Sequence, residues 1–539
     1  MSDSIREDAG IPMVARAAVP RRFRLVPVLL AAVFSGTIPA APVPTDAGSV
    51  EGVLQDSVRA FKGIPFAAPP VGDLRWRAPQ PVKRWSGVRL ATTFAPACPQ
   101  IQAGNAAMGF PVLPTSEDCL YLNVWSPVAP SSKPLPVMVW VYGGGFMGGA
   151  TSFPGYSGEA LAKKGVVVVS VAYRLGALGF LAHKELSAES AARGSGTYGL
   201  MDLIAGLQWV KRNIAAFGGD PGRVTIFGES AGATAVSMLA ASPKAAGLFH
   251  RAISESGGAF AAPRVGEEGG QTTPTLALAE RRGAALLARL GVKRIADARR
   301  LPADTIVQSA GSAPNVYWPV LDGDVLPDDP YTLYEARKYN DVPVLAGINS
   351  DEGALFVPVS DARQHEASVR AGYGRFAEEI LAAYPATSDA QALRSARDLF
   401  SDTIFGWPTW TWARLQSSTG GSRVFLYHFS HRAPRPDGRD TGGVGALHGS
   451  EIAYVFQQPS PAWTAADRAL SDTISTYWVN FAKSGDPNGP GLPSWPAYSA
   501  NSPMLLNLDS EPRPMPIPGL ERMTVLDRYY AWRRSELVR

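Results

Sequence analysis

Short apolar runs and longer amphipathic segments take turns along the chain. The apolar runs have the length and composition of strands buried in a sheet, and they lie at 137–141, 166–171, 224–227, 342–348 and 424–429. Helical periodicity is found at 201–214, 235–241 and 276–290. Strands that alternate with helices indicate a mostly parallel central sheet with helices on both faces. We therefore predict an α/β fold, with 276–290 in a helical insertion because no strand signal adjoins it.

The N-terminal part of the chain has the pattern of an export signal. A basic region that includes Arg21 and Arg22 precedes an apolar run at 25–34, which is too short to span a bilayer. Small residues around Ala40 and Ala41 suit cleavage. We expect an exported protein, periplasmic or secreted. The paired arginines hint at the twin-arginine route, and Met13 is an alternative start.

Composition and charge limit the organisation and the partners of the protein. With 539 residues, 46% of them hydrophobic and 18% charged, we expect a leader at 1–41 and a single domain at 42–539. The net charge is +4, and the first 44 residues contribute +2 of it. The remainder is nearly neutral, which gives no electrostatic argument for nucleic acid or an anionic membrane as a partner. We expect no stable membrane span after signal removal, and the sequence leaves the oligomeric state open.

A serine lies at the most informative point of the pattern. The β-prone run 224–227 continues directly into Gly228-Glu229-Ser230-Ala231-Gly232, and a helical stretch follows. Such a strand, sharp turn and helix exposes a serine hydroxyl, and its crowded flanks tolerate only glycine. The turn also directs the free N–H groups of the next helix towards developing negative charge. This context predicts a nucleophilic serine.

A second turn carries glycines that a purely structural role does not explain. The strand at 137–141 runs into Tyr142-Gly143-Gly144-Gly145-Phe146. Consecutive glycines cost conformational entropy, but they let bare N–H groups approach an anion closely. A phosphate loop is the rival interpretation, yet no Gly-Lys-Ser/Thr follows. Together with the serine turn, this stretch predicts an oxyanion hole.

The chain has only two cysteines, Cys98 and Cys119. In an exported protein an even, minimal number favours one disulfide, which would close a loop of about twenty residues. Two unrelated buried thiols are the alternative. A zinc site is excluded because none of the six histidines lies near either cysteine in the sequence.

A nucleophilic serine needs an imidazole base. His431 and His448 lie beyond the last predicted strand, on the side where sheets of this class place their sites. His448 stands among glycines, so we favour it over His431. His183 and His365 lie in charged, helical surroundings, where we expect solvated side chains.

The imidazole in turn needs a carboxylate that orients it. Asp351 and Glu352 follow the strand at 342–348, and Asp322 and Glu451 are their rivals. The order serine, acid, histidine is the one found in α/β-hydrolases.

Longer motifs around these residues resemble those of one family, the type-B carboxylesterases, which include cholinesterases and bacterial broad-range esterases. The resemblance covers the chain from about Gly48 to Tyr498. Its most specific motifs are at 117–125, 142–146, 217–232, 351–353 and 448–449.

The resemblance implies an α/β-hydrolase with helical insertions that form a gorge over the active site. The implied activity is hydrolysis of carboxylic esters through an acyl-enzyme, with no metal or cofactor. The catalytic residues would be Ser230 as nucleophile, Glu352 as acid and His448 as base. The supporting residues, which are the oxyanion-hole donors, a serine behind the triad and the disulfide, would be Gly144, Gly145, Ala231, Ser256 and Cys98–Cys119.

Departures from the family pattern bear on the substrate. In cholinesterases the loop closed by the first disulfide carries a tryptophan that receives the choline cation, whereas here 99–118 has no tryptophan and only Phe110 as a ring. The stretch that supplies acyl-pocket aromatics in those enzymes has no ring before Tyr317. We expect a broad-range esterase acting on uncharged esters, with Phe110, Tyr317 and Phe356 in its pocket.

Two alternatives stay open. A lipase-like esterase would act on lipid aggregates and would need a large apolar surface around its site. A binding module, such as the adhesion proteins that share this fold and lack the serine, would not need the intact residues Ser230, Glu352 and His448.

Overall fold

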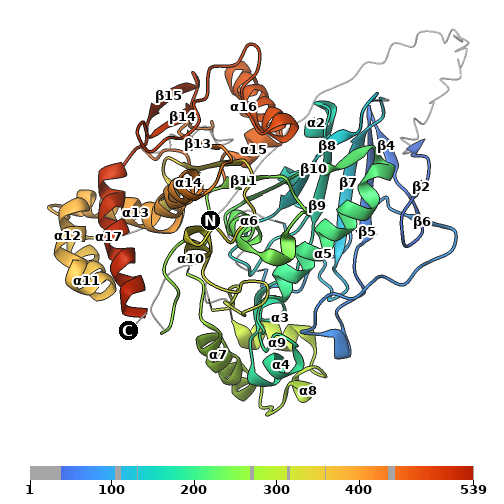
Figure 1. Cartoon of the computed structure of the whole chain (residues 1–539), viewed down its shortest axis with the longest axis horizontal. Helices are drawn as coiled ribbons and strands as arrows, with labels where there is room; N and C mark the ends of the chain where they lie inside the picture. Colours follow the sequence, from blue (N-terminus) through green and yellow to red (C-terminus); the bar gives the residue numbers. More distant parts are fainter. Residues whose placement is uncertain are drawn as a thin grey trace, which may run out of the picture. The chain divides into compact units, whose positions relative to one another are not determined.

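The computed structural model describes residues 38–102, 111–129, 131–266, 272–311, 316–358, 360–434 and 443–537. The expectations for the leader up to Thr37 and for Phe110 lie outside these residues. The described chain is built on one sheet of twelve strands in the order β1-β4-β5-β7-β9-β8-β10-β11-β12-β13-β14-β15 (Figure 1).

The sheet is parallel in its middle and antiparallel towards both ends. The parallel strands are β9 (Val167–Val171), β8 (Leu135–Val141), β10 (Gly219–Glu229), β11 (Arg251–Glu255), β12 (Val344–Asn349), β13 (Val424–Phe429) and β14 (Met504–Leu508). The antiparallel strands are β1 (Ile38–Pro39), β4 (Val53–Gln55), β5 (Val58–Pro65), β7 (Tyr121–Pro127) and β15 (Arg513–Pro516). The predicted mostly parallel α/β fold is confirmed, because every predicted apolar run lies in one of the parallel strands. The carboxyl ends of the parallel strands meet at one edge of the sheet.

Burial on both faces explains why the central strands are continuous apolar runs. β9 is buried along its whole length, and β8 is buried at every residue after Leu135. In the register of the sheet, Val139 of β8 lies beside Val169 of β9 on one side and Ile226 of β10 on the other. Such strands require helices over both faces, since neither face can meet water.

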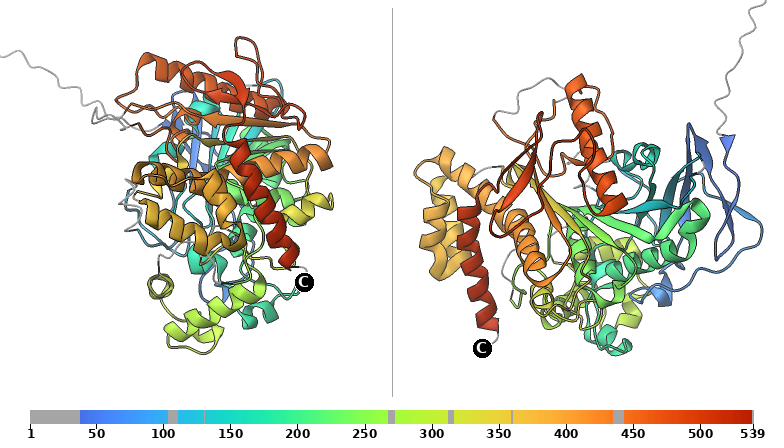
Figure 2. Two further views of the ribbon diagram at one scale, coloured as in Figure 1. Left: turned by 90° about the vertical axis from the view of Figure 1, so that its left-hand side faces the viewer. Right: turned by 45° about the horizontal axis from the view of Figure 1, so that its top comes forward.

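Helices cover both faces of this sheet. α5 (Tyr198–Asn213), α6 (Ala231–Ala241) and α14 (Trp407–Thr419) pack on one face, and α2 (Glu159–Lys163) and α16 (Ala465–Ser484) pack on the other (Figures 1 and 2). The predicted helix at 276–290 is α7 (Leu276–Arg289), which packs on α9 (Ala303–Ala310) away from the sheet. A further helical group, with a π-helical turn at Asp402–Gly406, precedes α14.

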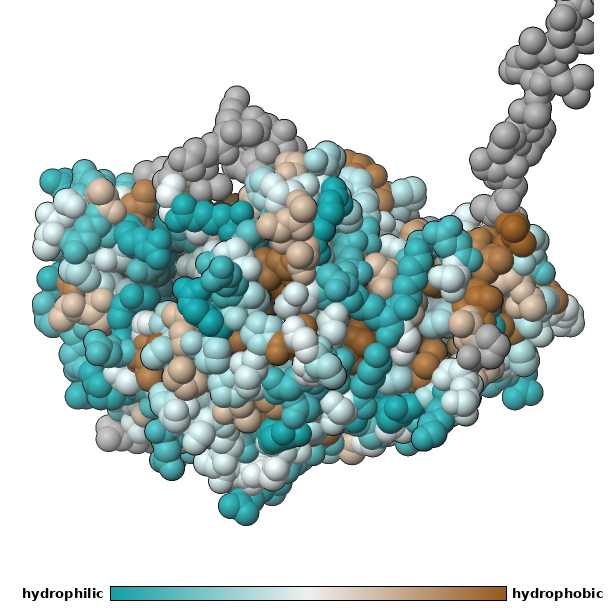
Figure 3. Space-filling model, turned by 90° about the horizontal axis from the view of Figure 1, so that it is seen from above, coloured by the Kyte–Doolittle hydropathy of each residue, from teal (hydrophilic) through white to brown (hydrophobic). Residues whose placement is uncertain are grey.

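The strands between Val43 and Leu90 are divided between two sheets. β4 and β5 form an antiparallel hairpin, but β3 (Ser49–Glu51) belongs to a separate sheet with β2 (Val43–Pro44) and β6 (Val88–Leu90). Apolar residues gather at this end of the molecule, on the right in Figure 3. Exposed apolar residues of these first strands include Val88 and Leu90 of β6, which are 50% and 67% exposed.

Cys98 and Cys119 form the predicted disulfide, and both residues are buried. The bond joins the two ends of the loop at 99–118, and Cys119 lies two residues before the start of β7. Within the described ranges, no helix is both long and apolar enough to cross a membrane.

We expect this disulfide to stabilise the fold mainly by lowering the conformational entropy of the unfolded chain. For a sequence separation of 21 residues, the chain-entropy model gives about 3 kcal/mol. Replacing both cysteines by serine should lower the free energy of unfolding in urea by roughly that amount. The double variant should not respond to reductant, whereas the unmodified chain should. Equal midpoints with and without reductant in the unmodified chain would contradict the prediction.

Candidate active site

The turn between β10 and α6 holds Ser230 in a conformation that few residues adopt. Its φ is 58° and its ψ is −123°, and its side chain is partly exposed at the sheet edge. A Cβ added to Gly228 would lie 2.5 Å from the carbonyl oxygen of Val141, and one added to Gly232 would lie 2.0 Å from the same oxygen. The end of β8 therefore crosses the turn so closely that only glycine fits on either side of the serine.

The neighbouring strand fixes the position of this turn. The backbone N–H of Ser230 donates to the carbonyl oxygen of Glu255, the last residue of β11, at 2.8 Å. Because β8, β10 and β11 are parallel and in register, the loops after them meet here. The sheet thus brings the serine turn beside the triple-glycine loop.

The triple-glycine loop lies next to the serine. Gly144 and Gly145 have φ values of 104° and 63°, which favour glycine. The carbonyl oxygen of Gly144 accepts from Met147 and Gly148, which closes the loop into a turn. A Cβ added to Gly143 would lie 2.9 Å from Cβ of Ser230, so the loop and the serine are in close contact.

A buried hydrogen bond joins Glu352 and His448. Nδ1 of His448 lies 2.6 Å from Oε2 of Glu352, which is completely buried. The other carboxylate oxygen accepts from the hydroxyl of Ser256 at 2.5 Å and from the backbone N–H of Asn349 at 2.7 Å. The structure therefore brings together three of the residues predicted for the site, Glu352, His448 and Ser256.

The second ring nitrogen of His448 faces a group that the sequence reasoning missed. Nε2 lies 3.0 Å from Oε1 of Glu229, the residue before the serine. The two atoms are within ion-pair distance, but Nε2 forms no hydrogen bond with any described residue, Ser230 included. The only signal for Glu229 was its place inside the serine turn, where a buried carboxyl group is unexpected.

Three buried glutamates, Glu229, Glu352 and Glu451, act on this imidazole, and a fourth, Glu255, is buried near Glu229 and Glu451. Burial raises the pKa of Glu229 and of Glu451, and like charges nearby raise both further. For His448, burial alone would lower the pKa, but the carboxylates of Glu229 and Glu352 outweigh it and raise the pKa to about 9. The site therefore stabilises a positive charge on the ring.

The rival candidates have other hydrogen-bond partners. Glu451, one rival for the acid, is hydrogen-bonded to the side chain of Asn349. Asp322, the other, accepts from the hydroxyl of Thr197 at 2.7 Å. Oδ1 of Asp467 lies 2.7 Å from Nε2 of His431, the rival base.

One histidine expectation was wrong. His365 is 2% exposed, and its Nε2 hydrogen-bonds the carbonyl oxygen of Tyr384 at 2.9 Å. Its charged sequence neighbours lie on the exposed face of the helix, whereas His365 lies on the buried face, so their charge gave no information about its burial.

Aromatic rings surround the imidazole. Phe356, one of the predicted pocket residues, is 39% exposed and lies with its ring centroid 5.2 Å from that of His448. Phe405, which was not predicted, stacks on the same imidazole at 4.6 Å. Tyr317 is 2% exposed, and its hydroxyl accepts from Arg289 at 3.3 Å. Phe110 lies outside the described residues.

A fold with a strained serine turn, a glycine loop and a buried carboxylate–imidazole pair defines the class of α/β-hydrolases. The model of the Carboxylesterase family matches residues 39–524, so the chain belongs to this family. It is a serine hydrolase of carboxylic esters.

Several known proteins are similar over most of their length. The chain is 40% identical over 490 residues to a fumonisin B1 esterase of Sphingopyxis macrogoltabida, covering 86% of this chain and 85% of the relative. It is 36% identical to the para-nitrobenzyl esterase of Bacillus subtilis, covering 87% and 95%, and 36% identical to the cholinesterase of Mus musculus, covering 87% and 83%. A solved structure of a PNB esterase has a TM-score of 0.78 at 35% identity and covers 90% of this chain and 99% of that one.

The carboxylates around His448 generate a prediction that does not depend on catalysis. In an NMR titration, the His448 ring should titrate near the pKa of about 9 that the structure indicates, above the 6.5 of a free histidine. Glu229→Gln should lower this pKa, because it removes a negative charge 3.0 Å from Nε2. Asp467→Asn, which alters the partner of His431, is the matched control. An unchanged His448 pKa in Glu229→Gln would contradict the prediction.

Proposed function

We propose that Ser230, His448 and Glu352 form the catalytic triad of this ester hydrolase. The observation that carries the proposal is the buried hydrogen bond between Glu352 and Nδ1 of His448, at the edge of the sheet that also carries the strained Ser230 turn. A carboxylate on Nδ1 holds the proton there and leaves Nε2 as the basic nitrogen.

In the proposed reaction, Nε2 of His448 takes the proton of the Ser230 hydroxyl as its oxygen attacks the ester carbonyl. The imidazolium that forms is stabilised by Glu352, and it then protonates the leaving alcohol. Water, deprotonated by the same nitrogen, then attacks the acyl-enzyme carbonyl, and the imidazolium returns its proton to the Ser230 oxygen as the acid leaves. In the described structure Nε2 has no hydrogen-bond partner, and substrate binding would have to bring it onto the serine hydroxyl.

The N–H groups of Gly144, Gly145 and Ala231 are our proposed oxyanion hole. Within the described part of the chain, none of the three donates a backbone hydrogen bond to another loop. Ala231 begins α6, so the free N–H groups and the dipole of that helix point towards the carbonyl oxygen. Ser256 would act through Glu352, which it holds in place.

We further propose a broad range of uncharged esters as substrates. Support comes from the ring of Phe356 beside His448 and from the lack of a tryptophan in the loop at 99–118. Two of the relatives are named for esters other than choline esters. Export from the cytoplasm, with a leader at 1–41 and a single domain from 42, is likewise proposed, and the disulfide is compatible with it.

Ser230→Ala should lower kcat/KM for a p-nitrophenyl ester by more than a thousandfold, because it removes the nucleophile. The fold should stay intact, because the lost hydroxyl is small and partly exposed. It should also abolish covalent labelling by a fluorophosphonate probe. Ser256→Ala is the matched control and should still be labelled. Residual activity within tenfold of the unmodified enzyme would refute the assignment of the nucleophile.

His448→Ala should be as damaging as Ser230→Ala, and His431→Ala should be mild. The physical reason is that His448 alone of the two is held by Glu352, whereas His431 contacts Asp467. Steady-state rates of both variants on the same ester give the comparison. If His431→Ala abolished ester hydrolysis and His448→Ala did not, His431 rather than His448 would be the base.

Choline esters should not be preferred over neutral esters of matched size. A full cation–π contact with a desolvated quaternary ammonium contributes about 2 kcal/mol, or roughly thirtyfold. The loop at 99–118 lacks the tryptophan that would provide it. The measurement is kcat/KM for butyrylcholine against the isostere in which carbon replaces the quaternary nitrogen, at constant ionic strength. A ratio above about thirty in favour of choline would contradict this prediction.

A further inference from the structure

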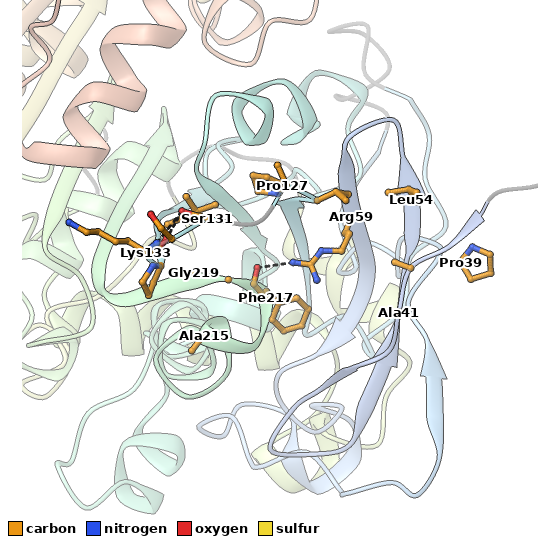
Figure 4. Close-up of a pocket in the computed structure, with 17 residues that line it drawn as sticks. Pro39, Ala41, Leu54, Arg59, Pro127, Ser131, Lys133, Ala215, Phe217 and Gly219 are labelled. Atoms are coloured by element: carbon orange, nitrogen blue, oxygen red, sulfur yellow. Dashed lines mark hydrogen bonds between the residues drawn. The ribbon is translucent and has the colours of Figure 1, made fainter.

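A second cavity lies away from Ser230 and His448, at the opposite ends of the strands that carry the site. Its volume in the full chain is about 610 Å³, and it is bounded by the first strands of the sheet, the loop before β8 and the turn before β10 (Figure 4). Pro39, Ala40 and Ala41, which fall within the proposed leader, contribute to one side, whereas the rest of the lining lies after it. Phe217, Gly218 and Leu135, at the amino-terminal ends of β10 and β8, form part of its wall. None of the residues proposed for catalysis lines it.

Arg59, in β5, contributes a guanidinium to the wall of this cavity. Its Nη2 donates to the hydroxyl of Ser126 at 2.9 Å and to the carbonyl oxygen of Phe217 at 3.3 Å. Figure 4 shows the side chain directed towards Phe217. Nη1 forms no hydrogen bond with a described residue, and Nε is buried without a partner.

No carboxylate neutralises this arginine. Arg59 forms no ion pair with any described residue, and burial lowers its pKa with no acidic neighbour to oppose the effect. Asp and Glu are absent from the described lining, and Asp220, adjacent to it in sequence, is paired with Arg223 at 2.8 Å. A partly buried cation without a counter-charge is unfavourable by itself, and an anionic ligand would relieve this cost.

The rest of the lining is mostly apolar. Leu54, Val128 and the ring of Phe217 lie around Arg59, together with several prolines and alanines. Lys133 adds a second positive charge at the rim, but its side chain points away from Arg59 (Figure 4). One cation in an apolar wall suits a ligand with one charged end and an apolar body better than it suits a small inorganic dianion.

We propose that this cavity binds a small carboxylate with an apolar tail, with the carboxylate on Arg59 and the tail against Phe217 and Leu54. The site is independent of the proposed triad, and it is tested by binding rather than by turnover. The acids released from esters belong to this chemical class.

The probe is hexanoate, and its binding to the full chain is measured by isothermal titration calorimetry after the reactive serine has been blocked with a fluorophosphonate. Arg59→Gln removes the charge and should weaken binding at least fivefold. Ala129→Glu places a carboxylate in the wall at an exposed position and should weaken it similarly, whereas Ala129→Gln, the matched control, should stay within twofold. Hexan-1-ol should bind more weakly than hexanoate to the unmodified chain.

Each outcome decides the proposal. Loss of affinity in Arg59→Gln and Ala129→Glu, with retention in Ala129→Gln, supports it even if Arg59→Gln is less stable, because Ala129→Glu leaves the arginine in place. Equal hexanoate affinity in all four proteins, or no binding to the unmodified chain, overturns it. Displacement of hexanoate by an equal concentration of inorganic phosphate also overturns it, since the site would then select charge alone.

Discussion

The carboxylate of Glu352 is the contact on which the geometry of the site depends. It accepts from Ser256, which follows β11, from the backbone of Asn349 at the end of β12, and from His448, which lies in the loop beyond β13. One buried group thus joins segments that follow three adjacent parallel strands. A carboxylate with this many donors holds a single orientation, so the imidazole inherits its position from the sheet rather than from its own glycine-rich loop.

This arrangement carries an electrostatic cost. Glu229, Glu255 and Glu451 are buried near Glu352, and burying ionised carboxyls is expensive. Burial raises the pKa of all three carboxyls, so each takes up a proton more readily than it would in water, which lowers this cost. A positive imidazolium is the natural counter-charge in such surroundings. Ester hydrolysis by the proposed triad places a positive charge on the His448 imidazole in its transition state, and the surrounding carboxylates are already positioned to stabilise that charge.

Local signals were enough for the fold and for most of the proposed site. The apolar runs predicted the strands, and the glycines around Ser230 predicted a crowded turn, because both depend on neighbouring residues. Glu229 and Phe405 were not predicted as parts of the site, and Glu451 was considered only as a rival for the acid, because their roles depend on where the sheet brings them, which no periodicity encodes. The same applies to Arg59, whose contact with Phe217 spans 158 positions. The prediction of a solvated His365 was wrong because its sequence neighbours lie on the exposed face of the helix and His365 lies on the buried face.

The two ends of the large sheet have a consequence for how the molecule behaves among its own copies. β1 contains Pro39, and β15 contains Pro514 and Pro516. Proline has no N–H group, so each outer strand lacks some of the donors that an approaching strand would need. Both edges are also short. A sheet of twelve strands is a large template for edge-to-edge aggregation, and in the full chain these prolines protect both of its ends. Removal of a leader at 1–41 would take β1 away and leave the prolines of β15 at the other end.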